Sequence, residues 1–126
     1  MAKTIIKPAG VLPAVGPYNL GVRVGGLLFC AGQVPLVPET GQLIAGGIRP
    51  QTERALENIR LILQDQGLTL ANVVKTTVFL TSLAEFNEMN EVYGRCFGQD
   101  FPARTTVEVS ALPRGAAIEI EAIASY

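Results

Sequence analysis

The sequence predicts one α+β domain over residues 1–126, in which a mixed β-sheet carries two helices on one of its faces. Two observations lead to this fold class: strand-like runs occupy both ends of the chain, and two helical patterns flank a further strand-like run in the middle. A chain of 126 residues fits a single domain, which can bury roughly 65% of its unfolded surface in one core. We expect no second domain.

The first half of the chain predicts short strands and a long loop. Lys3–Lys7 suits a short edge strand, and the prolines and glycines that follow it impose an irregular segment. Leu20–Val24 and Leu27–Ala31 are apolar runs joined by Gly25-Gly26, the composition of a two-residue hairpin turn. Residues 32–47 then predict a loop about fifteen residues long, and a loop of that length in a compact domain is usually functional.

The middle of the chain predicts a helix, a strand and a second helix. Pro50–Gln66 has proline in its opening turn, and Gly67 is placed to end the helix. Val73–Leu80 is rich in β-branched residues and long enough for a central strand. Ser82-Leu83-Ala84-Glu85 has the spacing of a capping box, which predicts the start of a helix that extends to about Phe97. Its inner face carries Phe86, Asn90, Tyr93 and Phe97.

Two alternating runs in the last quarter of the chain predict an antiparallel strand pair around a loop that contains proline and glycine. Because side chains alternate along a strand, Arg104 and Thr106 share one face of the first run. Glu119 and Glu121 likewise share one face of the second run. Pairing of the two strands would place Arg104 and Glu119 in one small region, where a guanidinium and a carboxylate can form a site.

The composition predicts an oligomer. The chain is 48% hydrophobic and only 17% charged, against roughly 25% charged residues in an average globular protein. No third helical pattern is available to cover the second face of the sheet. We therefore expect subunits to pack sheet against sheet, because a large exposed apolar surface otherwise promotes aggregation.

Charge and cysteine content narrow the classes of function. The formal net charge is −1 and the ten basic residues are scattered, so binding of nucleic acid is an unfavoured hypothesis. Cys30 and Cys96 lie far apart in the sequence, and we expect both to be small buried hydrophobic residues. The amino-terminal residues lack the pattern of a cleaved leader, and no stretch of roughly 18 consecutive apolar residues exists. We expect a cytoplasmic protein with no membrane span.

Histidine is absent from the chain, and this absence restricts the chemistry more than any other count. It removes the commonest general base, the Ser-His and Cys-His nucleophile pairs and the usual imidazole ligands of metals. Catalysis by this chain must therefore use arginine, glutamate, tyrosine, threonine or backbone groups.

The same C-terminal quarter resembles the signature of a known family. Residues 102–109 read Pro-Ala-Arg-Thr-Thr-Val-Glu-Val, and a Leu-Pro, a short spacer and Ile-Glu-Ile-Glu-Ala-Ile-Ala follow. Further matches lie at Val15–Tyr18, Cys30–Pro35, Pro38–Gly41 and Asn90–Tyr93, so the similarity covers essentially the whole chain. The sequence thus resembles the reactive intermediate deaminases, the RidA or YjgF-like family.

The resemblance implies a fold, an assembly and an activity. The fold is chorismate-mutase-like, and members of the family are homotrimers with clefts between subunits. The implied reaction is hydrolytic deamination of reactive 2-imino acids, such as 2-iminopropanoate derived from 2-aminoacrylate and 2-iminobutanoate, to 2-oxo acids and ammonia. Because an imine carbon is already electrophilic, this reaction requires neither a metal nor a cofactor.

The resemblance also gives roles to residues that have other readings when they are considered alone. Arg104 alone is more often a surface or interface ion-pair residue, whereas the matching arginine of the family holds the substrate carboxylate. Glu119 alone suits a solvated strand face, whereas the matching glutamate positions the attacking water. Tyr18 alone is as readily a packed loop aromatic, whereas the matching tyrosine lines the cleft. We expect Arg104 and Glu119 to be catalytic.

Three further residues complete the expected substrate-binding set. Asn90 places an amide on an apolar helical stripe, where a missing hydrogen-bond partner costs about 1 to 3 kcal/mol, and the family places this asparagine near the pocket. Gly32 allows a tight turn or the approach of a main-chain amide to a ligand. Thr106 stands where many members of the family have cysteine, which excludes thiol chemistry at that position but leaves a hydroxyl that can donate a hydrogen bond.

Three other functions remain open from the sequence. A trimer that binds small carboxylates without turnover would use Arg104 but has little need of Glu119. Ribonuclease or translation-inhibitor activity, which has been attached to some relatives, is disfavoured by the acidic balance and the lack of histidine. A chaperone-like role through exposed apolar surface ranks last.

Overall fold

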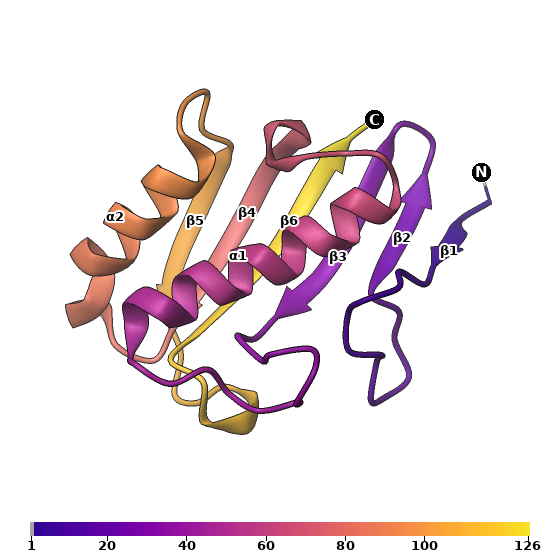
Figure 1. The fold of residues 1–126 in the computed structure, drawn as a ribbon. Helices are drawn as coiled ribbons and strands as arrows, with labels where there is room; N and C mark the ends of the chain where they lie inside the picture. The colour runs from indigo at the N-terminus through magenta and orange to yellow at the C-terminus, as the bar shows by residue number, and fades with distance from the viewer. Residues whose placement is uncertain (1) are drawn as a thin grey trace.

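The computed structural model describes residues 2–126 and contains one six-stranded sheet and two long helices (Figure 1). The elements in chain order are β1 (Thr4–Ile6), β2 (Gly21–Val24), β3 (Leu27–Gln33), α1 (Ile48–Asp65), β4 (Val73–Leu80), α2 (Phe86–Phe97), β5 (Ala103–Glu108) and β6 (Ile118–Ser125). Three short 3-10 turns lie at Leu70–Asn72, Leu83–Glu85 and Pro113–Gly115. The predicted α+β class with a mixed sheet and two helices is confirmed.

The strands are arranged in the order β1-β2-β3-β6-β4-β5, and only the β4–β5 pair is parallel. The predicted pairing of the two C-terminal strands is wrong, because β6 pairs with β3 and β4 while β5 pairs only with β4. Helix α2 forms the crossover that a parallel β4–β5 pair requires. The segment between β5 and β6 then passes the end of β4, where Val109 donates to the Leu80 carbonyl and Thr81 donates to the Ala117 carbonyl.

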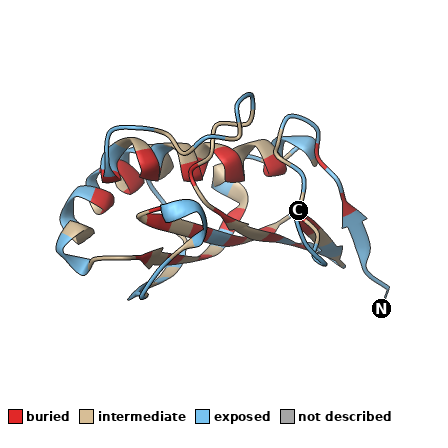
Figure 2. Ribbon diagram, turned by 90° about the horizontal axis from the view of Figure 1, so that it is seen from below, coloured by how far each residue is buried: buried red, intermediate tan, exposed pale blue. Residues whose placement is uncertain are grey.

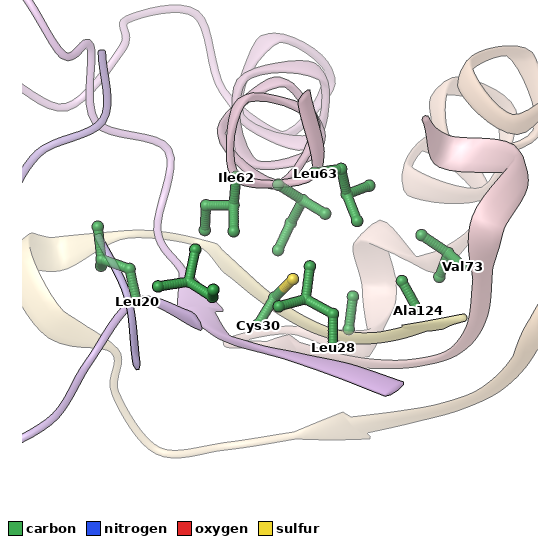
Figure 3. Close-up of a cluster of buried hydrophobic side chains, with 10 residues drawn as sticks. Leu20, Leu28, Cys30, Ile62, Leu63, Val73 and Ala124 are labelled. Atoms are coloured by element: carbon green, nitrogen blue, oxygen red, sulfur yellow. The ribbon is translucent and has the colours of Figure 1, made fainter. Parts of the chain in front are cut away.

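Both helices lie on the same face of the sheet, and the side view in Figure 2 shows the other face without a covering layer. The core between helices and sheet consists of two clusters of buried side chains. Figure 3 shows the first cluster, in which Ile62 and Leu63 of α1 lie above Leu28 and Cys30 of β3. The second cluster joins both helices to β4 and β6 through Leu56, Met89, Val78 and Ile120.

The helix boundaries follow local chemistry. Helix α1 has Pro50 in its first turn and is followed by Gly67 at φ 71°, as the sequence predicts. The second helix begins later than predicted, because Ser82 accepts a hydrogen bond from Ala84 N–H at 3.3 Å and so caps the 3-10 turn that precedes α2. Neither helix of the described chain has the length and apolar character needed to cross a membrane.

The uncovered face of the sheet carries large apolar side chains. Leu27, Phe29 and Val107 are 40%, 41% and 37% exposed, and the register of β3, β6, β4 and β5 places them on the face away from the helices. This is the exposed apolar surface that the composition predicts. The homotrimer that would cover it stays a prediction.

Candidate active site

Arg104 lines a pocket of about 310 Å³ between α2 and the start of β5. Its register partner on β4 is Thr76, which faces the helices, so the Arg104 side chain also lies on the helix side of the sheet. Two of the predicted site residues share this pocket, which is lined by Asn90, Tyr93, Gly94, Phe101, Pro102 and Arg104.

The guanidinium of Arg104 is held by aromatic rings and by sulfur. Its Cζ lies 4.8 Å from the ring centroid of Tyr93 and 5.5 Å from that of Phe86. Its Nη1 lies 4.0 Å from the sulfur of Met89. No ion pair within residues 2–126 involves Arg104. The cation is therefore positioned without a carboxylate partner, and its fork of N–H groups remains able to bind a carboxylate of a ligand.

Two buried oxygens on α2 and β5 have no hydrogen-bond partner in the described part of the chain: Oδ1 of Asn90 and Oγ1 of Thr106. Thr106 follows Arg104 on the same face of β5, since its register partner Val78 is a core residue. A buried polar atom without a partner costs about 1 to 3 kcal/mol, and such atoms cluster at functional sites. Of the two residues, Asn90 lines the pocket of Arg104, and Thr106 lies two residues beyond Arg104 on β5.

Glu119 lies on the opposite face of the sheet from Arg104. Its register partner on β4 is Phe79, whereas its neighbours Ile118 and Ile120 are fully buried beneath the helices. The Glu119 carboxyl is half-buried, and this burial raises its pKa, with a smaller contribution from the charge of Glu121. A carboxylate of raised pKa is a stronger base, which suits activation of water.

Gly32 lies directly against Glu119. The β3–β6 register shifts between Cys30 and Gln33, so Ala31 and Gly32 form a β-bulge opposite Glu121. A Cβ on Gly32 would overlap Oε2 of Glu119 and lie 3.0 Å from its Cδ. The φ angle of Gly32 is not in the left-handed region, so space for the Glu119 carboxylate explains the glycine at this position.

Tyr18 lies in the segment that leads into β2. Leu20 accepts a hydrogen bond from Ala31 N–H at 2.8 Å, so this segment runs beside the bulge that contains Gly32. The Tyr18 side chain is 49% exposed, and its hydroxyl accepts a long hydrogen bond of 3.5 Å from Val15 N–H.

The predicted site residues thus form two groups within one chain. Asn90, Arg104 and Thr106 lie on the helix side, and Gly32 lies with Glu119 at the bulge on the uncovered side. The expectation that Arg104 and Glu119 lie in one small region is therefore wrong for a single chain. It failed because it assumed that β5 pairs with β6.

The aromatic surroundings of Arg104 were not predicted. Tyr93 and Phe86 belong to the inner face of the second helix, but nothing in their spacing shows that β5 places an arginine above them. Cys30 is buried as expected, and this burial raises its pKa to about 12. Cys96 is only partly buried, so the expectation that it is a buried residue is wrong, although its partial burial still raises its pKa.

Comparison with known proteins gives consistent matches over the whole domain. The sequence model of the family described as Endoribonuclease L-PSP matches residues 10–126. A RutC family protein of Pyrococcus abyssi is 48% identical over 98% of each chain. The human protein named 2-iminobutanoate/2-iminopropanoate deaminase is 41% identical, over 98% of this chain and 90% of the human one.

Solved structures agree with the sequence relatives. The crystal structure of Escherichia coli TdcF with bound serine superposes with a TM-score of 0.92 at 38% identity, over 98% of each chain. A match of this extent, in both sequence and fold, goes well beyond a shared architecture. The chain therefore belongs to the RidA/YjgF/L-PSP (RutC) family.

Proposed function

We propose that this protein hydrolyses 2-imino acids, such as 2-iminopropanoate and 2-iminobutanoate, to 2-oxo acids and ammonia. The observation that carries the proposal is the guanidinium of Arg104, which lines a pocket without a carboxylate partner among residues 2–126. The human relative at 41% identity bears the name of this activity, which supports the choice of substrate.

In the proposed mechanism Arg104 binds the substrate carboxylate through two parallel N–H donors. This contact fixes the imine carbon relative to the rest of the pocket, so that binding energy is used for orientation. The unpartnered oxygen of Asn90 accepts from the N–H of the imine, which is the donor that a 2-imino acid has and its 2-oxo product lacks. The hydroxyl of Thr106 provides a further hydrogen bond.

Glu119 acts on water. Its carboxylate removes a proton from water as the water oxygen forms a bond to the imine carbon. Glu119 then returns this proton to the imine nitrogen, which gives a carbinolamine and restores the carboxylate. Collapse of this intermediate forms the carbonyl of the 2-oxo acid and releases ammonia, while the remaining hydroxyl proton is transferred to the leaving nitrogen. The raised pKa of Glu119 supports this role, because it brings the carboxyl closer to the pH of the reaction. No step needs a metal or a cofactor.

The two groups of site residues lie on opposite faces of one sheet, so a single chain cannot present Arg104 and Glu119 to the same substrate. We therefore propose a homotrimer in which each cleft takes Arg104, Asn90 and Thr106 from one subunit. The neighbouring subunit contributes Glu119 and Gly32 from its uncovered face, and Tyr18 from the segment that runs beside the bulge. The exposed Leu27, Phe29 and Val107 on that face supply the apolar area that such an interface needs.

Ammonia release from freshly generated 2-iminobutanoate tests the proposal. A dehydratase that acts on threonine supplies the substrate, and the rate with the protein is compared with spontaneous hydrolysis. We expect faster release, together with saturation by substrate. Release that stays at the spontaneous rate, despite measurable binding of 2-oxobutanoate, would instead support a carboxylate-binding trimer without turnover.

A second candidate, ribonuclease activity, is favoured by the description of the matching family model. Incubation with single-stranded RNA, combined with a salt titration of RNA binding, decides between the two. We expect no cleavage, because the chain has no histidine and a net charge of −1.

A further inference from the structure

Arg104 of β5, Thr76 of β4 and Tyr93 of α2 contact one another in a closed cycle. Thr76 on β4 is paired with Arg104 on β5. The hydroxyls of Thr76 and Tyr93 share a hydrogen bond of 2.6 Å. The ring of Tyr93 in turn lies 4.8 Å from the guanidinium carbon of Arg104. Backbone pairing, a hydrogen bond and a cation–π contact thus connect the three residues in a cycle.

Two of the three residues in this cycle are buried. Thr76 is 1% exposed and Tyr93 is 4% exposed, so each hydroxyl depends on the other for its hydrogen bond. Burial also raises the pKa of Tyr93, which keeps the phenol protonated and neutral at physiological pH. The ring therefore attracts the guanidinium through its π face and not as an anion.

We propose that Tyr93, fixed by Thr76, is a positioning residue that orients the guanidinium of Arg104 toward the carboxylate of the substrate. The inference rests on the proposed function for the identity of that carboxylate. It explains why an arginine in a pocket lies over rings: a carboxylate partner would also orient Arg104, but it would occupy the N–H donors that the substrate needs. A ring orients the cation and leaves those donors free.

The alternative is that Tyr93 is only a packed core aromatic. It lies 4.6 Å from the ring of Phe97, and its loss would then affect stability alone. Two conservative variants separate the readings. Tyr93→Phe keeps the ring and removes the hydroxyl, and Thr76→Val removes the other partner of the same hydrogen bond while keeping the shape of the side chain.

The chain contains a matched control at the other end of the sheet. Arg23 on β2 lies 3.8 Å from the ring centroid of Tyr126, whose hydroxyl donates to Gln66 at 2.8 Å. Tyr126→Phe therefore removes a hydroxyl from a second arginine–ring contact, far from the pocket. This contact lies at the surface, and Arg23 is held in addition by a hydrogen bond from its Nε to the Gly25 carbonyl at 3.2 Å.

The first measurement uses no ligand. NMR relaxation of the arginine Nε–H groups reports the order parameter of each guanidinium in the assembled protein. We expect Tyr93→Phe and Thr76→Val each to lower the order parameter of Arg104 and to leave that of Arg23 unchanged, whereas Tyr126→Phe should leave that of Arg104 unchanged. An order parameter of Arg104 that stays at the wild-type value in both pocket variants overturns the inference.

The second measurement is a double-mutant cycle on the binding of 2-oxobutanoate. Tyr93→Phe should weaken binding about three- to tenfold in the wild-type background and have no further effect in an Arg104→Ala background, since it acts through Arg104. Equal weakening in both backgrounds overturns the inference. If wild-type protein neither binds 2-oxobutanoate nor releases ammonia, the proposed function fails instead, and the ligand-free order parameters alone decide the role of Tyr93.

Discussion

Gly32 lies so close to Glu119 that a methyl group at position 32 would overlap the Glu119 carboxylate, with the new carbon 3.0 Å from Cδ. Carbon atoms that are not bonded normally approach no closer than about 3.5 Å, so the carboxylate must move if this glycine gains a side chain. The position of the proposed base, Glu119, therefore depends on the β-bulge of β3.

This contact predicts that Gly32→Ala damages catalysis more than stability. The clashing atoms lie at the end of a flexible side chain, so Glu119 can turn away while the backbone stays in place. We expect kcat/KM for imine hydrolysis to fall at least about tenfold, since displacement of a catalytic group by an ångström is already costly. Gly26→Ala is the control, because a Cβ at Gly26 meets nothing within 4 Å. Similar activities of the two variants would remove Gly32 from the site.

Glu119→Gln should lower activity without lowering the thermal stability of the protein. The pKa of Glu119 is raised in the folded chain, so the native state binds its proton more tightly than the unfolded state. Stability therefore falls as pH rises through the range between the ordinary glutamate pKa and the raised one. At neutral pH the variant, which is uncharged at this position, should melt at a temperature equal to or above that of wild type, and this difference should vanish in acid. Ammonia release should fall strongly while affinity for 2-oxobutanoate changes little.

Arg104→Ala should lower kcat/KM by about tenfold to a hundredfold, because a charge-assisted bidentate contact is worth roughly 1.5 to 3 kcal/mol. Lysine should rescue only part of this loss, since its single ammonium lacks the planar fork and stacks less well on Tyr93 and Phe86. Mass, melting temperature and ammonia release are measured on the same preparation. Loss of assembly together with activity would assign Arg104 to an interface ion pair.

Mixing of two impaired variants tests the shared cleft. When Arg104→Ala and Glu119→Gln chains are unfolded and refolded together in equal amounts, about a quarter of the clefts in a homotrimer receive both intact residues. We expect activity to return to about that fraction of wild type, and sedimentation equilibrium to give a trimer of the 13.4 kDa chain. A mixture of Arg104→Ala with the doubly substituted chain is the control and should show no gain in activity over its two components. Failure of the first mixture to regain activity would contradict the assignment of the two residues to different subunits.

Iodoacetamide should leave the folded protein active. Burial raises the pKa of Cys30 to about 12, so almost none of it is present as thiolate at neutral pH. The pKa of Cys96 is also raised, and Cys96 is not part of the pocket that contains Arg104. Labelling is followed by mass spectrometry alongside ammonia release. Inactivation that substrate prevents would place a thiol in the site and contradict the proposed mechanism.

The local sequence pattern predicted the helices and strands well, but it did not predict correctly which strands pair with each other. The β-branched residues from Val73 to Leu80 predicted β4 with its observed bounds. Pro50 and Gly67 located the ends of α1 to within two residues, since the helix runs from Ile48 to Asp65. The position of β6 between β3 and β4 follows from contacts between residues far apart in the sequence, which no local period encodes.

For the site residues, too, the sequence predicted which residues take part but not where they lie relative to one another. Residue type and family resemblance selected Arg104 and Glu119, but only the register on β4 reveals that they face opposite sides of the sheet. The closeness of Gly32 to Glu119 depends on a bulge, and the ring of Tyr93 beneath Arg104 depends on how α2 packs. Both arise from tertiary structure.

The sheet face that carries Glu119 also carries the exposed Phe29 and Val107. In the proposed trimer, activity therefore depends on the same equilibrium as subunit association. If a neighbouring chain both covers these side chains and receives the carboxylate, dilution removes apolar burial and the proposed base from the same cleft in one step. Specific activity then depends on protein concentration near the dissociation constant of the assembly. Below that concentration, total activity would fall more steeply than the amount of protein.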